Sequence, residues 1–227
     1  MSTSNLTPEA EGLEVAVLGS FNPAIFHPEW FLRYKLIGEN DAKEAEVNVV
    51  GSEVTDIQIC GIKLVCIKDR FSLGIANISH AARMQDLLLQ IFTLLPHIPV
   101  TACGINPSVH FKISDTQYWH KIGHTLAPKE LIWNDLKQLE KPGMRSLNIT
   151  ALRTGEFPGQ TNITVEPSLR FPPGLFVQSN YHYPVPAEAI HTTAVELVLK
   201  FLKEEWNPAC AMARIVANKI FEKIKPD

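Results

Sequence analysis

The chain has 227 residues, 45% hydrophobic and 20% charged, and these values exclude an intrinsically disordered protein. Its formal net charge of −3 lacks the basic excess that neutralises many phosphates, so nonspecific nucleic-acid binding is disfavoured. No stretch approaches the roughly 20 apolar residues that span a bilayer, and the N-terminus is polar and acidic, so we expect a soluble, cytoplasmic protein.

The first half of the chain predicts a strand, a short helix, an antiparallel meander and a long helix. Residues 1–12 are expected to form a flexible N-terminus, and residues 13–20 alternate apolar and polar side chains as a strand does. Helical spacing of apolar residues after Pro28 predicts a helix over 28–37. The remaining predicted elements of this half are strands over 46–50, 54–60, 62–68 and 71–76, and an amphipathic helix over 79–95 with Ser79 as its N-cap.

The second half, residues 97–206, is expected to repeat this order of elements. The predicted strands cover 100–113, 147–153, 162–169 and 175–182, and the predicted helices include 118–122 and 186–205. An insertion over 125–143 lengthens one connection and carries a predicted helix around 129–139. Residues 207–227 form a C-terminal segment whose helix, over 208–224, places apolar residues on one stripe: Met212, Ile215, Val216, Ile220 and Ile224. That stripe either docks on the core or pairs with another subunit, and we favour the partner.

An internal repeat is the most informative pattern in the sequence. The stretch 19–27 contains an Asn-Pro pair at Asn22 and ends at His27, and the stretch 104–110 contains another at Asn106 and ends at His110. Each is followed by an aromatic helical pattern. The sequence therefore predicts an α+β fold with two β-α-β-meander-α repeats, over 13–96 and 97–206, and an additional C-terminal helix.

This duplicated order of elements resembles the fold of the TATA-binding protein and its relatives. The resemblance implies a curved antiparallel sheet, formed by both halves and backed by helices. The intercalating phenylalanines and the basic concave face that such a fold uses on DNA are not identifiable in this sequence. The resemblance therefore implies the fold and not the DNA-binding function.

Recurring asparagines and histidines at equivalent places of the two halves indicate a shared ligand site. The structural interpretation, which we favour, is that each asparagine of the Asn-Pro pairs supports a tight turn and the proline fixes its geometry. The candidate ligand-binding residues are Asn22, His27, Asn106, His110, Asn180 and His182.

The sequence patterns that would indicate a metal site or a catalytic site are weaker than those for the ligand site. His120 and His124 share one helix face, but the intervening residues supply neither a third zinc ligand nor a glutamate base, so no metal site is predicted. The four cysteines have no CxxC pair and are expected to be buried free thiols. Residue types suited to catalysis occur without a motif that brings them together, at Asp115, Glu166, Ser168 and His182. No catalytic residue or cofactor is assigned, and whether the protein is an enzyme stays open, leaning toward no.

Three functions are compatible with the sequence. The leading hypothesis is a noncatalytic protein-interaction or assembly protein that binds another protein, or itself, through its sheet or its C-terminal helix. A first alternative is nucleic-acid binding through the curved sheet, which requires a set of cations to project from one face: Lys63, Lys68, Arg70, Arg153 and Arg170. A second alternative is an enzyme or small-ligand receptor with its site between the halves.

Overall fold

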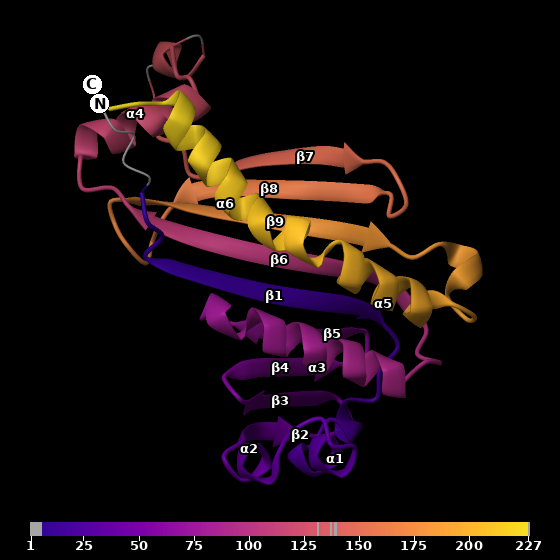
Figure 1. The fold of residues 1–227 in the computed structure, drawn as a ribbon. Helices are drawn as coiled ribbons and strands as arrows, with labels where there is room; N and C mark the ends of the chain where they lie inside the picture. The colour runs from indigo at the N-terminus through magenta and orange to yellow at the C-terminus, as the bar shows by residue number, and fades with distance from the viewer. Residues whose placement is uncertain (1–5, 131, 137, 139, 227) are drawn as a thin grey trace.

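The protein, described here by a computed structural model over residues 6–130, 132–136, 138 and 140–226, contains one curved antiparallel sheet (Figure 1). The nine strands of this described part lie in the order β2-β3-β4-β5-β1-β6-β9-β8-β7. Their bounds are β1 Ala10–Gly19, β2 Glu46–Val50, β3 Val54–Ile59, β4 Ile62–Ile67, β5 Arg70–Ile75, β6 Val100–Lys112, β7 Leu147–Arg153, β8 Gly159–Pro167 and β9 Gly174–Pro184. The mixed α and β fold class and the curved antiparallel sheet are thus confirmed.

The two halves of the chain share this single sheet. The central strands β1 and β6 pair antiparallel from Ala10 opposite His110 to Gly19 opposite Val100. The strands before residue 97 extend the sheet from β1 to β2, and those after it extend the sheet from β6 to β7. The β1–β6 pairing therefore joins the halves through backbone hydrogen bonds.

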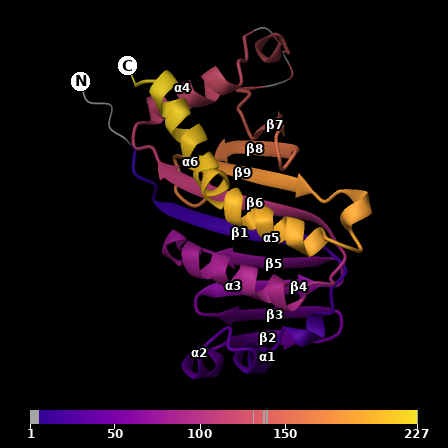
Figure 2. The same ribbon diagram turned by 45° about the vertical axis from the view of Figure 1, so that its right-hand side comes forward.

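The long helices cover one face of the sheet (Figures 1 and 2). The six α-helices of the described residues are α1 Pro28–Arg33, α2 Glu39–Lys43, α3 Ala81–Leu94, α4 Thr116–Leu126, α5 Ala194–Glu204 and α6 Trp206–Lys223. Helix α3 packs on α5 and β5, whereas α6 packs on β6 and β9. We call the opposite side of the sheet, which these three helices leave uncovered, the open face. None of the described helices combines the length and apolar character needed to cross a bilayer.

The period-two alternation of side chains assigns each strand residue to one of these faces. In β9 the odd-numbered residues, such as Val177 and Tyr181, are buried beneath the helices. The even-numbered residues Gln178 and Asn180 are half-buried and belong to the open face. The hydrophobic core consequently lies between the sheet and the helices, and the open face carries mainly polar side chains.

Helix α6 docks on its own sheet through alanines. Ala209, Ala213 and Ala217 recur every four residues and are fully buried, which lets the helix backbone approach β6 and β9 closely. Ile215, which the sequence placed on the apolar stripe, is instead 55% exposed. The other four predicted residues do contact the core, since Met212, Val216 and Ile220 pack against it and Ile224 is buried. The apolar stripe therefore docks on the core of its own chain, and the small alanines beside it complete the buried face.

Helix α4 is fixed at its N-terminus and along the buried side of its first turn. The carboxylate of Asp115 accepts hydrogen bonds from the backbone N–H groups of Gln117 and Tyr118, at 2.8 and 3.1 Å, and so caps the N-terminus. The Tyr118 hydroxyl donates to the Ile224 carbonyl at 2.7 Å, just past the end of α6. The Trp119 indole donates to the Gly174 carbonyl at 2.9 Å. These bonds hold α4 over the ends of β9 and α6.

Several predicted boundaries differ from the observed ones. Strand β1 begins at Ala10 rather than at residue 13, and α1 ends at Arg33 rather than at residue 37, because Lys35 adopts a φ of 57° that ends the helix. The predicted cap Ser79 lies inside a short 3₁₀ turn, which Asn77 caps by accepting from the Ser79 N–H at 3.0 Å.

The helices of the second half also begin elsewhere. Helix α5 starts at Ala194 rather than at 186, after a 3₁₀ turn, and α6 starts at Trp206 rather than at 208. The predicted helix over 129–139 includes residues 131, 137 and 139, which lie outside the described residues. The described part of the insertion contains the last two residues of α4, Thr125 and Leu126, and a 3₁₀ turn over Trp133–Asp135.

Candidate functional site

A ladder of amide side chains crosses the open face from β6 to β7. The Asn180 side-chain amide donates to the Asn106 carbonyl oxygen, and the Asn162 amide donates to that of Asn180 at 3.1 Å. The Thr150 hydroxyl then donates to the Asn162 oxygen at 2.9 Å. Cross-strand pairing of β6 through β7 places these four residues side by side. We call Asn106, Asn180, Asn162 and Thr150 the amide ladder.

The ladder begins where proline interrupts the backbone pairing. Asn106 and Pro107 lie in the middle of β6, opposite Glu14 and Leu13 of β1, so the tight turn predicted for this Asn-Pro pair was wrong. The β6–β9 pairing is interrupted at these two residues, because proline has no N–H to donate. The Asn106–Asn180 side-chain bond bridges the two strands at that gap.

Asn22 and His27 lie apart from the ladder and act as helix caps. The Asn22 side chain follows β1 and accepts from the Ala24 N–H at 3.3 Å, which caps a 3₁₀ turn. His27 Nδ1 accepts from the Glu29 N–H at 3.3 Å and caps α1. Asn22 and Asn106 therefore do not occupy equivalent places, one being past a strand end and the other within a strand.

His110 and His182 both belong to the open face but do not meet. His110 is opposite Phe176 and His182 is opposite Gly104. Six residues along β9 therefore separate the two positions, which corresponds to roughly 20 Å. His110 Nδ1 forms a hydrogen bond of 2.9 Å with the Ser168 hydroxyl oxygen, which also accepts from the Phe171 N–H at 3.1 Å. The structure thus brings Asn106 and Asn180 together and leaves the histidines separate.

Burial lowers the pKa of both histidines. For His110 the second cause is the positive charge of Arg170, and for His182 it is that of Arg153. Arg153 itself lies under the helices, where its guanidinium carbon is 3.6 Å from the centre of the Tyr181 ring. The Tyr181 hydroxyl donates to the Glu205 carboxylate at 2.8 Å. Desolvation and the positive charges of Arg170 and Arg153 therefore favour the neutral form of the two imidazoles.

These lowered pKa values predict a loss of stability in acid. Below the unfolded-state pKa of about 6.5 the unfolded chain binds a proton at His110 more readily than the folded chain does, so the free energy of unfolding falls as the pH falls. The loss begins near that pH and grows until the folded-state pKa is passed. Melting temperatures measured from pH 7.5 to 5 should fall less in His110→Gln than in the wild type. His191→Gln, at an exposed position, should follow the wild type, and identical curves for all three proteins would refute the assignment.

A shallow hollow of about 490 Å³ lies on the open face where β1 meets β6. Its lining includes Asn106, Ser108 and Gln178 from the second half, and Glu14 and Lys63 from the first. The charges that line it are already paired, since Lys63 lies 3.5 Å from Asp56 and Arg70 forms an ion pair with Glu14. The hollow is therefore a polar surface whose charges are neutralised within the protein.

The cations that the nucleic-acid alternative requires do not share one face. Lys63 and Arg70 belong to the open face, but Arg153 stacks beneath the helices and Arg170 lies in the β8–β9 connection. Lys68 lies in the β4–β5 turn and pairs with Glu53 at 2.7 Å. This distribution gives the nucleic-acid alternative no support from charge.

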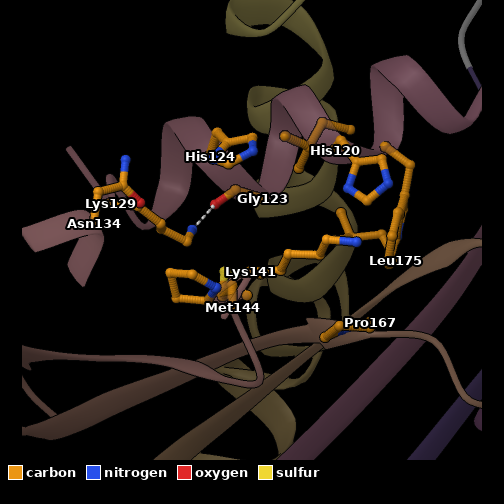
Figure 3. Close-up of a pocket in the computed structure, with 13 residues that line it drawn as sticks. His120, Gly123, His124, Lys129, Asn134, Lys141, Met144, Pro167 and Leu175 are labelled. Carbon is orange, nitrogen blue, oxygen red and sulfur yellow. Dashed lines mark hydrogen bonds between the residues drawn. The ribbon is translucent and has the colours of Figure 1, made fainter. Parts of the chain in front are cut away.

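A second pocket, of about 430 Å³, lies between α4 and the segment 141–144 (Figure 3). His120 and His124, the predicted pair on one helix face, both line it, and Lys141 extends beneath the helix. The Lys129 ammonium donates to the Gly123 carbonyl at 3.0 Å and to that of Ala127, and it so neutralises the C-terminal carbonyls of α4. We call this cavity the α4 pocket.

The described residues contain no group of three or more histidine, cysteine and acidic side chains that would hold a metal ion. All four cysteines are free thiols, and Cys66 and Cys103 are buried as expected, whereas Cys60 and Cys210 are half-buried. Burial raises the pKa of the Cys66 and Cys210 thiols to about 12. Thiols with raised pKa values are poor nucleophiles, which fits a packing role.

No family model matches the sequence, and a search of curated proteins found no match. Asn162 and Thr150 of the amide ladder lie in predicted strands, but their neighbours depend on the strand register, which the local sequence does not give. Lys129 and Lys141 were not predicted as site residues, because the sequence of the insertion does not indicate that it folds back beside α4.

Proposed function

We propose that the protein is a noncatalytic assembly protein that joins a second copy of itself through strand β7. The observation that carries this proposal is that β7 is an edge strand, since within the described residues it pairs with β8 alone. This strand pairs with β8 in an unbroken register from Leu147 to Arg153, so its outer backbone groups form a regular row. An unpaired, regular strand edge is a template for adding another strand.

The side chains of β7 lack the features that protect a sheet edge from pairing. Leu152 is 84% exposed and Ile149 is 48% exposed, and residues 147–152 carry neither charge nor proline. The charge of Arg153 is directed inward, onto Tyr181 and the His182 carbonyl. The opposite edge differs, because β2 contains a register shift between Val47 and Val49 and lies beside α1 and α2 (Figures 1 and 2).

A second copy fits this edge because the strand is complementary to itself. Antiparallel pairing about a twofold axis at Thr150 keeps all seven residues paired and places Asn148 opposite Leu152 of the second copy. Thr150 then faces its own counterpart, and a threonine pair across strands is favourable. The neutral segment brings no like charges together, and the amide ladder, which ends at Thr150, continues into the second copy.

Charge substitutions at Thr150 test this arrangement. Thr150 is exposed, so aspartate or lysine should be tolerated by the folded chain. In Thr150→Asp or Thr150→Lys, two like charges face each other across the axis, and each variant alone should be monomeric. An equimolar mixture should restore the dimer, because opposite charges then meet. Light scattering coupled to size exclusion reports the mass against the 25.4 kDa of one chain.

Leu169→Asp is the matched control, because Leu169 is 95% exposed but lies in the β8–β9 connection. That variant should remain dimeric like the wild type. A monomeric wild type at all accessible concentrations would contradict self-association. A mixture of the two Thr150 variants that stays monomeric, when the wild type is dimeric, would place the interface elsewhere.

We also infer that the chain arose by duplication of one unit. The order of elements supports this: β1 and β6 each lie at the centre, each is followed by helical turns and then by antiparallel strands, and α3 and α5 close the two halves on the same face. The halves differ in that four strands follow β1 and three follow β6. The same order is the basis of the proposed relation to the TATA-binding protein fold. A structural superposition of residues 13–96 on 97–206 tests it, since unlike connections would refute duplication.

A further inference from the structure

We propose that the α4 pocket binds a small monocarboxylate with an apolar body. The pocket of about 430 Å³ falls within the range of cavities that bind small ligands. Much of its wall is apolar, from Trp119, Ile122, Met144, Pro167 and Leu175. Such a wall favours a hydrocarbon or aromatic body.

The polar groups of the pocket favour an anion. His120 and His124 lie one turn apart on α4 and face the cavity, and each imidazole supplies an N–H donor. Lys141 adds a permanent positive charge that extends toward His120 (Figure 3). No aspartate or glutamate occurs among the described lining residues. A carboxylate placed among these three side chains would accept hydrogen bonds from them.

The positive charge available in the pocket suits a carboxylate, which carries one negative charge, better than a phosphate, which carries more. Lys129 also lines the pocket, but its ammonium donates to the carbonyls of Gly123 and Ala127 and is buried there. Within the described part of the chain, no carboxylate pairs with Lys141. One uncompensated lysine matches the charge of one carboxylate.

The wall of the pocket that α4 supplies is held in place before a ligand arrives. The Trp119 indole is fixed by its hydrogen bond to the Gly174 carbonyl, and Ile122 is buried. Preorganised walls reduce the entropy that is lost when a ligand binds.

Calorimetric titration with octanoate, octan-1-ol and inorganic phosphate tests the proposal on the full-length protein. Octanoate should bind with saturation at one molecule per chain, and the alcohol and phosphate should each bind at least tenfold more weakly. Lys141→Gln keeps a polar side chain, one atom shorter, and removes the charge, so it should weaken octanoate binding at least tenfold and leave octanol binding unchanged. His120→Gln combined with His124→Gln should weaken octanoate binding several-fold.

Arg145→Gln removes a nearby exposed cation that does not line the pocket and should bind octanoate like the wild type. In an NMR spectrum, octanoate should shift the indole N–H signal of Trp119, which Trp119→Phe identifies. Absence of saturable octanoate binding would overturn the proposal, as would equal affinity in Lys141→Gln. Phosphate binding as tight as octanoate binding would overturn the assignment of an apolar ligand. The self-association tests use different residues, so either proposal can fail without the other.

Discussion

Gly174→Ala is expected to lower the free energy of unfolding by about 3 kcal/mol. A β-carbon at this position would collide with the backbone carbonyl oxygens of Phe111 and Phe171, which cannot move aside as a flexible side chain would. The Gly174 carbonyl also accepts hydrogen bonds from the Ser168 N–H and the Trp119 indole, both at 2.9 Å. Displacing this residue therefore disturbs β6, the β8–β9 connection and α4 together. Urea denaturation followed by circular dichroism measures the loss.

Gly123→Ala is the matched control for this substitution. Gly123 lies within α4, and a β-carbon there would meet no atom within 4 Å. Because alanine favours the helix more than glycine does, this variant should gain about 1 kcal/mol. Equal stability of Gly174→Ala and the wild type would show that the backbone around residue 174 can shift at little cost.

Ala213→Leu is expected to destabilise the protein by about 1–3 kcal/mol. Ala213 is fully buried where α6 lies on β6 and β9, so a leucine forces the helix away from the sheet. Ala211→Leu introduces the same side chain two residues earlier, at an exposed position of the same helix. That control should remain within about 0.5 kcal/mol of the wild type. Equal midpoints for the two variants in chemical denaturation would refute close docking of α6.

The hydrophobic patterns predicted most strands and the long helices, because in an element buried on one face the hydrophobic residues recur at a regular spacing. The strand over residues 147–153 was predicted with its observed bounds, although β7 is largely exposed, since its β-branched residues and flanking turns sufficed. Helix starts were less predictable. Proline at 186 suggested the start of a helix, but a 3₁₀ turn precedes α5 and delays it to Ala194.

The candidate site was only partly predictable, because its residues meet through the register of the sheet. Asn106 and Asn180 were both proposed as ligand-binding residues, yet their mutual hydrogen bond depends on the pairing of β6 with β9. The Asn-Pro similarity suggested that Asn22 and Asn106 were equivalent, although local sequence does not distinguish a proline in a turn from one inside a strand. His120 and His124 were correctly placed on one helix face, but the cation opposite them comes from a segment without periodicity.

The two edges of the sheet are unlike each other, and under the proposed self-association that difference would limit the size of the assembly. If both edge strands were regular and unpaired, copies would add at either edge of the sheet and a filament would grow without limit. Here the kinked β2, beside two short helices, offers no straight partner for β7. If two β7 strands pair as proposed, both remaining edges of the joined sheet are β2 strands, and we expect a closed particle of two chains with eighteen strands in one sheet.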